Sequence, residues 1–127
     1  FKPLGQGTGL VGLPGAMTGP ARFVRAAAMV HLADQPADSA TAERYTMHVM
    51  NAFDMVPGIV KESFGAVGVV DEVTVWDTIA NLTGGRYAYR TVTNPQWYVV
   101  DLAATDFTTP ARTQELNWTG SFTPVTV

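Results

Sequence analysis

The chain has 127 residues, 46% of them hydrophobic, which is enough for one ordinary domain with a buried core. The formal net charge is −3 and the eight Lys and Arg residues are scattered, so the chain has no basic stripe to neutralise a nucleic-acid backbone. It contains no cysteine, which excludes disulfides, thiolate–zinc sites and a cysteine nucleophile within these residues. Its apolar runs are far shorter than the ~20 residues that span a bilayer. We therefore expect neither a nucleic-acid partner nor a membrane-spanning segment.

The first 19 residues are expected to form a glycine-rich loop, because glycine and proline at this density favour irregular backbone. The stretch 7–12 has G-x-G-x-x-G spacing, but a dinucleotide site needs this motif between a strand and a helix. A poor strand precedes it here, and Leu13-Pro14-Gly15 would break any helix that followed. The start at Phe1 has no initiator methionine and no signal peptide, which indicates an internal boundary made by cleavage or by choice of segment.

Two helices are predicted within residues 20–56. Gly19-Pro20 begins the first, because proline suits the first helical position and the preceding residues can cap the helix. Its body, up to Leu32, is apolar almost all round, which is typical of a helix buried by other elements. After a connection at residues 34–39, the second helix shows an apolar face at offsets of three and four, and Pro57-Gly58 ends it. That face comprises Tyr45, His48, Val49, Ala52, Phe53 and Val56.

A three-stranded antiparallel meander is predicted over residues 72–102, where the hydrophobic period changes to two. The expected strands run from Glu72 to Ile79, from Arg86 to Val92 and from Gln96 to Leu102, with turns at residues 81–85 and at Asn94-Pro95. Residues 103–127 are read as a packed tail. Two helices can cover one face of such a sheet, while aromatic residues and valines on both faces indicate that more protein covers the other. The fold class is therefore α+β.

Most polar residues form no recognisable site. His31 with Asp34, or His48 with Asn51, could be written as helical metal pairs, but zinc needs three or four ligands. The serines at 39, 63 and 121 have no nucleophile elbow or evident base, and the carboxylate pairs 71/72 and 101/106 fall where solvated charges usually lie. We expect no metal and no cofactor.

Arg22 and Arg25 are the exception. They lie three residues apart, roughly on one side of an otherwise apolar helix, and a buried guanidinium is costly unless it is paired. The presence of each arginine on this helix therefore has two possible explanations. The guanidinium pairs with a carboxylate elsewhere in the fold, or it has a role in an active site.

Two segments resemble the choloylglycine hydrolase family, which contains conjugated bile salt hydrolases and penicillin V acylases. Residues 12–27, GLPGAMTGPARFVRAA, are similar to that family's Gly-Leu-Pro-Gly-Asp-x-Ser-Ser-x-(Ser/Ala)-Arg-Phe-(Val/Leu)-Arg segment. Residues 86–91 (RYAYRT) and 99–102 (VVDL) are similar in order and spacing to its C-terminal strands, and the resemblance covers roughly residues 5–107. One departure is Ala16, which stands where the family usually has aspartate.

The resemblance implies part of an αββα N-terminal-nucleophile hydrolase, a cysteine-dependent enzyme that cleaves linear amide C–N bonds. Its substrates would be penicillin V, conjugated bile salts or N-acyl homoserine lactones. The cysteine would begin a preceding segment of the same protein, so this chain would be the C-terminal portion of one hydrolase domain, with Arg22 as its catalytic residue and Arg25 as a structural one. A positive charge near the cysteine would favour the thiolate.

The resemblance further implies a homo-oligomer, usually a tetramer, in the bacterial cytoplasm or periplasm, and the Trp-rich strands incline us to the periplasm. A catalytically silent binding or structural module that keeps the fold is the alternative.

Overall fold

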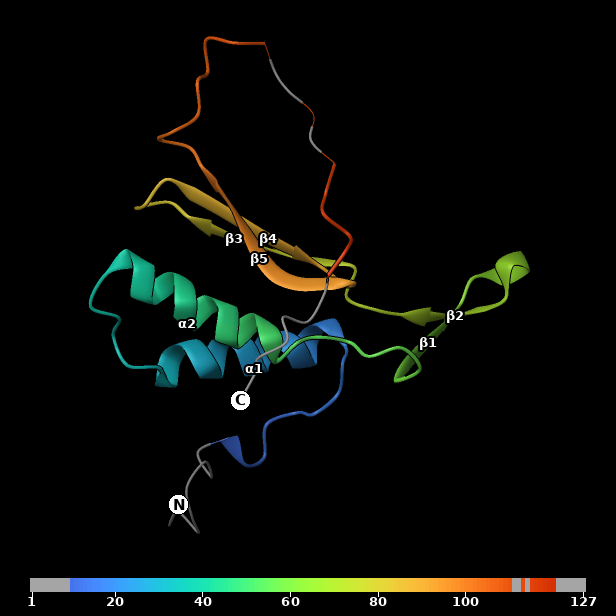
Figure 1. Cartoon of the computed structure of the whole chain (residues 1–127). Coiled ribbons are helices and arrows are strands. Elements are labelled where there is room, and N and C mark those ends of the chain that lie inside the picture. The colour runs from blue at the N-terminus through green and yellow to red at the C-terminus, as the bar shows by residue number, and fades with distance from the viewer. Residues whose placement is uncertain (1–9, 111–112, 114, 121–127) are drawn as a thin grey trace, which may run out of the picture.

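The computed structural model describes residues 10–110, 113 and 115–120, in which two helices lie on one face of a three-stranded antiparallel sheet (Figure 1). The α2 helix lies next to the sheet, and α1 packs on the side of α2 away from it. A separate two-stranded hairpin projects away from this body. The elements are α1 (Gly19–Leu32), α2 (Ser39–Asn51), β1 (Val60–Ser63), η2 (Gly65–Val67), β2 (Val69–Glu72), β3 (Trp76–Asn81), β4 (Arg86–Thr91) and β5 (Asn94–Asp101). The predicted α+β class, two helices followed by an antiparallel meander, is confirmed.

Both helices begin at residues suited to capping. Thr18 is the extended N-cap of α1, its carbonyl accepts a hydrogen bond of 3.0 Å from the Arg22 N–H, and Pro20 occupies the first turn. Asp38 caps α2, because its Oδ1 accepts a hydrogen bond of 2.6 Å from the Thr41 backbone N–H. Bonds from the Thr41 N–H and hydroxyl hold the pKa of Asp38 below its ordinary value, since they favour the charged carboxylate. Local chemistry thus sets where each helix starts.

The prediction that the second helix continues to Val56 is wrong, because α2 ends at Asn51. The N–H groups of Ala52 and Phe53 still bond to helix carbonyls, but the residues after them have partners outside the helix. The Met55 N–H donates to Thr74 Oγ1 at 2.9 Å, and the Asp54 carboxylate turns toward Arg90 on the sheet. The apolar periodicity past Asn51 does not mark a buried helix face, because Val56 is 58% exposed.

The predicted first strand, Glu72 to Ile79, is two strands with different partners. Its beginning belongs to β2, which pairs with β1 in the hairpin, and its end belongs to β3, which pairs with β4. The link at Thr74 is fixed from outside the sheet by its hydrogen bond to Met55. Alternation of side chains runs through both halves and does not reveal which strand each half pairs with. The hairpin of β1 and β2 was not predicted.

The turn between β4 and β5 lies at residues 92–93 instead of at Asn94-Pro95, because Asn94 already pairs with Thr91. Asn94 is buried, and its Nδ2 donates to Tyr98 Oη at 2.9 Å and to the carbonyl of Thr119 at 3.0 Å. The tail segment 115–120 thus returns to this turn. Gly120 lies so close to it that an added Cβ would come within 2.7 Å of the Thr93 carbonyl oxygen, so only glycine fits there.

The face of the sheet toward α2 combines a small apolar core with a polar cluster. Ile79 of β3 and Ala88 of β4 are paired across the strands and buried. Beside them the buried Glu43 of α2 accepts a hydrogen bond of 3.0 Å from Asn81 Nδ2 and forms an ion pair of 3.3 Å with Arg86. Each of these polar groups is paired, as burial requires. The cluster joins the middle of α2 to β3 and β4.

Two large apolar surfaces remain uncovered by the described residues. The predicted burial of α1 is not met within this part of the chain, where Phe23 is 74% exposed and Val30 is 68% exposed. On the face of the sheet away from α2, Trp76 and Tyr87 are exposed, and Tyr89 stacks on Tyr98 with ring centroids 5.5 Å apart. Within the described residues, neither helix combines the length and the hydropathy needed to cross a membrane.

Replacing Glu43 with alanine is expected to lower the free energy of unfolding by about 2 kcal/mol, because Asn81 loses a partner and Arg86 loses its counter-ion. Urea denaturation measures the change. The control is Glu62→Ala on the exposed hairpin, which should shift stability by less than about 0.5 kcal/mol. Equal effects of the two substitutions would contradict the structural role of Glu43.

The Asp38 cap predicts an acid-dependent term in stability. Because its folded pKa is depressed, the stabilisation is present above the ordinary aspartate pKa and is lost as the pH falls through the lower folded value. Asp38→Asn keeps a capping oxygen without the titration, so the melting temperature of wild type relative to this variant should drop between pH 7 and pH 3. A constant difference across that range would argue against the cap. Asp38→Ala should melt lower than both at pH 7.

Candidate active site

Arg22, the sequence-predicted catalytic residue, lies at the start of α1 with its side chain half-buried in an open groove. The groove has a volume of about 320 Å³ and is lined by Gly19, Arg22, Phe23 and Ala26 of α1 and by Met50 and Phe53 from the end of α2. Among the described residues, no carboxylate lies within ion-pair distance of Arg22. This part of the chain therefore leaves the positive charge of Arg22 uncompensated.

Arg25 has a different role from Arg22, although both lie on α1. Its Nη1 donates hydrogen bonds to the backbone carbonyls of Pro14 at 2.8 Å and Ala16 at 2.7 Å, and its Nη2 lies 3.7 Å from the sulfur of Met17. The guanidinium also sits over the Phe53 ring, 5.3 Å from its centroid. Arg25 thus holds the loop before α1 against the helix and against the end of α2, and no described carboxylate pairs with it.

Ala16, the departure from the family pattern, contributes to this loop through its backbone. Its carbonyl oxygen accepts a hydrogen bond from Arg25, while its side chain is exposed. A main-chain acceptor is present whatever the residue type. In the described structure the loop is therefore held to α1 without help from a carboxylate at position 16.

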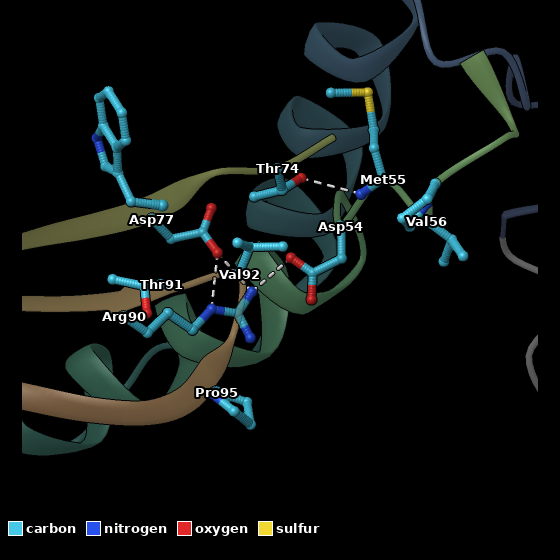
Figure 2. A pocket seen from close by; sticks show the side chains of 11 residues that line it. Asp54, Met55, Val56, Thr74, Asp77, Arg90, Thr91, Val92 and Pro95 are labelled. Atoms are coloured by element: carbon cyan, nitrogen blue, oxygen red, sulfur yellow. Dashed lines mark hydrogen bonds and ion pairs between the residues drawn. The ribbon is translucent and has the colours of Figure 1, made fainter. Parts of the chain in front are cut away.

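A second arginine cluster, which the sequence analysis missed, joins the sheet to the end of α2 (Figure 2). Arg90 of β4 is 8% exposed and donates from Nε to Asp77 Oδ2 at 2.7 Å, from Nη1 to Asn51 Oδ1 at 2.7 Å and from Nη2 to Asp54 Oδ1 at 2.6 Å. Its guanidinium lies 5.1 Å from the centroid of the Trp97 ring. All three nitrogens of one side chain are thus engaged.

A cavity of about 210 Å³ adjoins this cluster (Figure 2). Met55, Thr74, Trp76 and Pro95 are among the residues that line it, together with Arg90 and its carboxylate partners. Within the described residues, no buried side-chain polar atom lacks a hydrogen-bond partner. The buried polar side-chain atoms of the cluster therefore all have partners within the chain, which is typical of residues that hold two elements together.

One signal could have located this joint. Alternation along β4 places Arg90 on the same face as Ala88, and the tyrosines of β4 lie on the other face. The sequence therefore already indicated a charged residue on the face that the helices cover. A charge on a covered face needs partners, and Asp77 lies on the same face of the neighbouring strand. What could not be read from the sequence is the part played by Asn51 and Asp54, because both were assigned to a continuous helix.

The other candidate residues do not converge. His31 and His48 are exposed in the last turns of their helices, and the described residues contain no group of three or more potential metal ligands. Asp71 forms an exposed ion pair of 2.9 Å with Lys61. Hydrogen bonds from the side chain and backbone N–H of Thr108 lower the pKa of Asp106, which is a local turn arrangement. Ser121 and residues 7–9 of the G-x-G-x-x-G stretch lie outside the described residues.

Comparison with known proteins identifies relatives that match most of this chain. The chain is 35% identical over 100 residues to a bile salt hydrolase/transferase from Clostridium perfringens, and 34% identical over 86 residues to the uncharacterized protein A284L of Paramecium bursaria Chlorella virus 1. These matches include 78% and 67% of this chain but only 29% and 31% of the respective relatives.

Solved structures agree with these matches. The structure is similar to that of a mutant conjugated bile acid hydrolase from Clostridium perfringens, with a TM-score of 0.71 and 31% identity over 98% of this chain and 37% of that one. A second variant of that hydrolase gives a TM-score of 0.69 at 31% identity, with 95% of this chain and 36% of the other covered. The chain thus spans about a third of the length of these relatives, and the predicted assignment to an N-terminal-nucleophile hydrolase fold is confirmed.

The sequence model of the family described as linear amide C–N hydrolases, choloylglycine hydrolase family, matches residues 1–117, which include both arginine clusters and every strand. This match and the two structural likenesses agree with the resemblance of the Arg22 segment and of the meander. The chain belongs to the choloylglycine hydrolase family.

Proposed function

We propose that this chain forms the arginine-bearing part of a cysteine-dependent N-terminal-nucleophile hydrolase that cleaves linear amide C–N bonds. The observation that carries the proposal is the position of Arg22, a cation in an open groove with no described carboxylate to neutralise it. Membership of an amide hydrolase family and likeness to a bile acid hydrolase support it. Arg22 is the residue through which this chain would take part in the reaction.

In the proposed mechanism a cysteine thiolate attacks the amide carbonyl, the C–N bond breaks and the amine leaves with a proton. Water then hydrolyses the resulting thioester and releases the acid. The free α-amino group of the cysteine would act as the base. A guanidinium close to the thiol would lower its pKa, because a neighbouring cation favours the thiolate. The uncompensated charge of Arg22 suits this task, since a carboxylate partner would cancel its field.

The cysteine itself would come from a segment of the same protein that precedes Phe1. In one of the similar solved structures, a cysteine at the second position has been replaced by alanine, which supports a nucleophile near the amino terminus. The surface beside Arg22 also suits contact with further protein, because the adjacent Phe23 and Val24 are 74% and 43% exposed. The exposed aromatic face of the sheet would similarly meet the second sheet of an αββα sandwich.

The substrate would be a conjugated bile salt, penicillin V or an N-acyl homoserine lactone. The names of the relatives favour bile salts. The resemblance also supports a homotetramer in a bacterial cell, with the periplasm favoured over the cytoplasm. A catalytically silent module is the competing proposal, and the absence of cysteine from the 127 residues favours it.

Intact-mass spectrometry of the natural protein separates these two proposals. The hydrolase proposal expects a longer chain, or a companion polypeptide, whose first residue is cysteine. A folded preparation that contains only a 13.6 kDa species would contradict it and favour the silent module. Iodoacetamide labelling of the cysteine provides a second readout, since loss of hydrolysis on labelling is expected only of a cysteine enzyme.

Arg22→Ala in the full-length protein is expected to lower kcat/KM for an acyl amide by about 100-fold, the usual scale for loss of one electrostatic group at a reacting centre. Parallel assays with the three substrate classes measure it. The control is Arg44→Ala, which removes an exposed arginine whose described hydrogen bond goes only to Thr41 and should leave kcat/KM unchanged. Unchanged hydrolysis in the Arg22 variant would remove its catalytic role.

A further inference from the structure

We propose that Arg90 is a positioning residue for Arg22 and acts through the segment where α2 ends, residues 50–55, which we call the α2 exit. The inference rests on the proposed function of Arg22. Arg90 is buried in the sheet and does not line the groove, so its proposed part in the reaction is indirect. The contacts of the α2 exit, taken one side at a time, carry the inference.

The α2 exit presents two different sides at helical spacing. Met50 and Phe53 lie three residues apart and line the groove that holds Arg22. Asn51 and Asp54 follow each of them by one residue and accept hydrogen bonds of 2.7 and 2.6 Å from Arg90. One turn of chain therefore forms a wall for Arg22 on one side and is held by Arg90 on the other.

The α2 exit has further attachments that leave it little freedom. Thr74 Oγ1 accepts from the Met55 N–H at 2.9 Å and lies 3.5 Å from the Phe53 carbonyl oxygen, and Arg25 stacks on the Phe53 ring. These contacts fix its end and its far side. Arg90 supplies the contacts to its middle. Movement of Asn51 or Asp54 would carry Met50 or Phe53 with it, because they are chain neighbours in a closed turn.

Arg90 is suited to this task by its own anchorage. Asp77 binds its Nε, the Trp97 ring covers its guanidinium and the side chain is buried, so its fork is rigid before it reaches the α2 exit. A lysine would offer one flexible ammonium in place of three directed nitrogens. Arg86 on the same strand also binds α2, but at Glu43, in the middle of the helix and away from the groove. Of the arginines in the described strands, Arg90 is the one that binds the segment forming the wall of the Arg22 groove.

The test removes the acceptors and keeps the buried arginine paired. In the full-length protein, Asn51→Ala combined with Asp54→Ala leaves the Arg90–Asp77 bond in place, because neither substitution changes Arg90 or Asp77. Both replaced residues are exposed, so the substitutions open no buried cavity. We expect kcat to fall about 10-fold with less than about 2-fold change in KM, because displaced catalytic groups cost rate more than binding. The acidic limb of the pH–rate profile should move to higher pH, because a displaced Arg22 would stabilise the thiolate less and so lower the pKa of the thiol less.

Three controls distinguish positioning from loss of structure. Asp54→Asn keeps an oxygen for Arg90 Nη2 and should restore kcat to within about 2-fold of wild type when Asn51 is intact. Arg86→Gln removes the other arginine tie between β4 and α2 and should lower the melting temperature without moving the pH–rate profile. In an Arg22→Ala background, the double alanine substitution should have almost no further effect on kcat.

The outcomes separate this inference from the proposed function. If wild type hydrolyses no amide, or if Arg22→Ala is as active as wild type, the proposed function of Arg22 fails. If Arg22→Ala is impaired while the double alanine variant keeps wild-type kcat and pH profile, the positioning role of Arg90 is overturned. An undiminished effect of the double substitution in the Arg22→Ala background would also overturn it, because Arg90 would then act independently of Arg22.

Discussion

The buried guanidinium of Arg90 is the constraint on which the arrangement of the helices and the sheet depends. A charge removed from water must be compensated by opposite charge and by hydrogen bonds, and here the compensation comes from two segments of the chain. Asp77 belongs to the neighbouring strand, whereas Asn51 and Asp54 lie where α2 ends. The helix cannot slide along the sheet without breaking a charge-assisted bond. The position of the groove around Arg22 follows from that register.

Two further arginines hold other parts of the same helices in place. Arg86 meets the buried Glu43 at the middle of α2, and Arg25 ties the loop before α1 to that helix and to Phe53. Each of these three is satisfied by described residues. Arg22 differs from all of them, because its guanidinium lines a groove and has neither a hydrogen-bond partner nor an ion-pair partner among the described residues. This contrast with three arginines that are held by described residues is what makes Arg22 a functional candidate.

The sequence was most informative where a pattern depends on neighbouring residues. The start of α1 at Gly19-Pro20 and the alternation in β4 were readable, because capping and pleating act over a few residues. The end of α2 and the division between β2 and β3 were not readable, since both depend on bonds to residues far along the chain. Thr74 illustrates this, because its hydroxyl binds the backbone of Met55 from 19 residues away.

The candidate site divides in the same manner. Arg22 could be named because it lies in a motif whose family resemblance is specific, while physical reasoning alone left its role open. The joint around Arg90 was not predicted, because its hydrogen-bond partners are spread over the end of α2 and the neighbouring strand and no short motif contains them. The uncovered face of α1 was also not predicted. An apolar helix sequence indicates that the helix is covered by other residues, but it does not indicate which residues cover it.

The backbone attachment of the loop before α1 has an evolutionary consequence. Arg25 donates hydrogen bonds to the carbonyl oxygens of Pro14 and Ala16 and not to their side chains. The residue type at position 16 can therefore change without altering how the loop is anchored. The alanine at position 16 therefore affects what the loop presents to its surroundings and not how the loop is anchored. Selection can therefore act on the chemistry at position 16 separately from the shape of the loop that displays it.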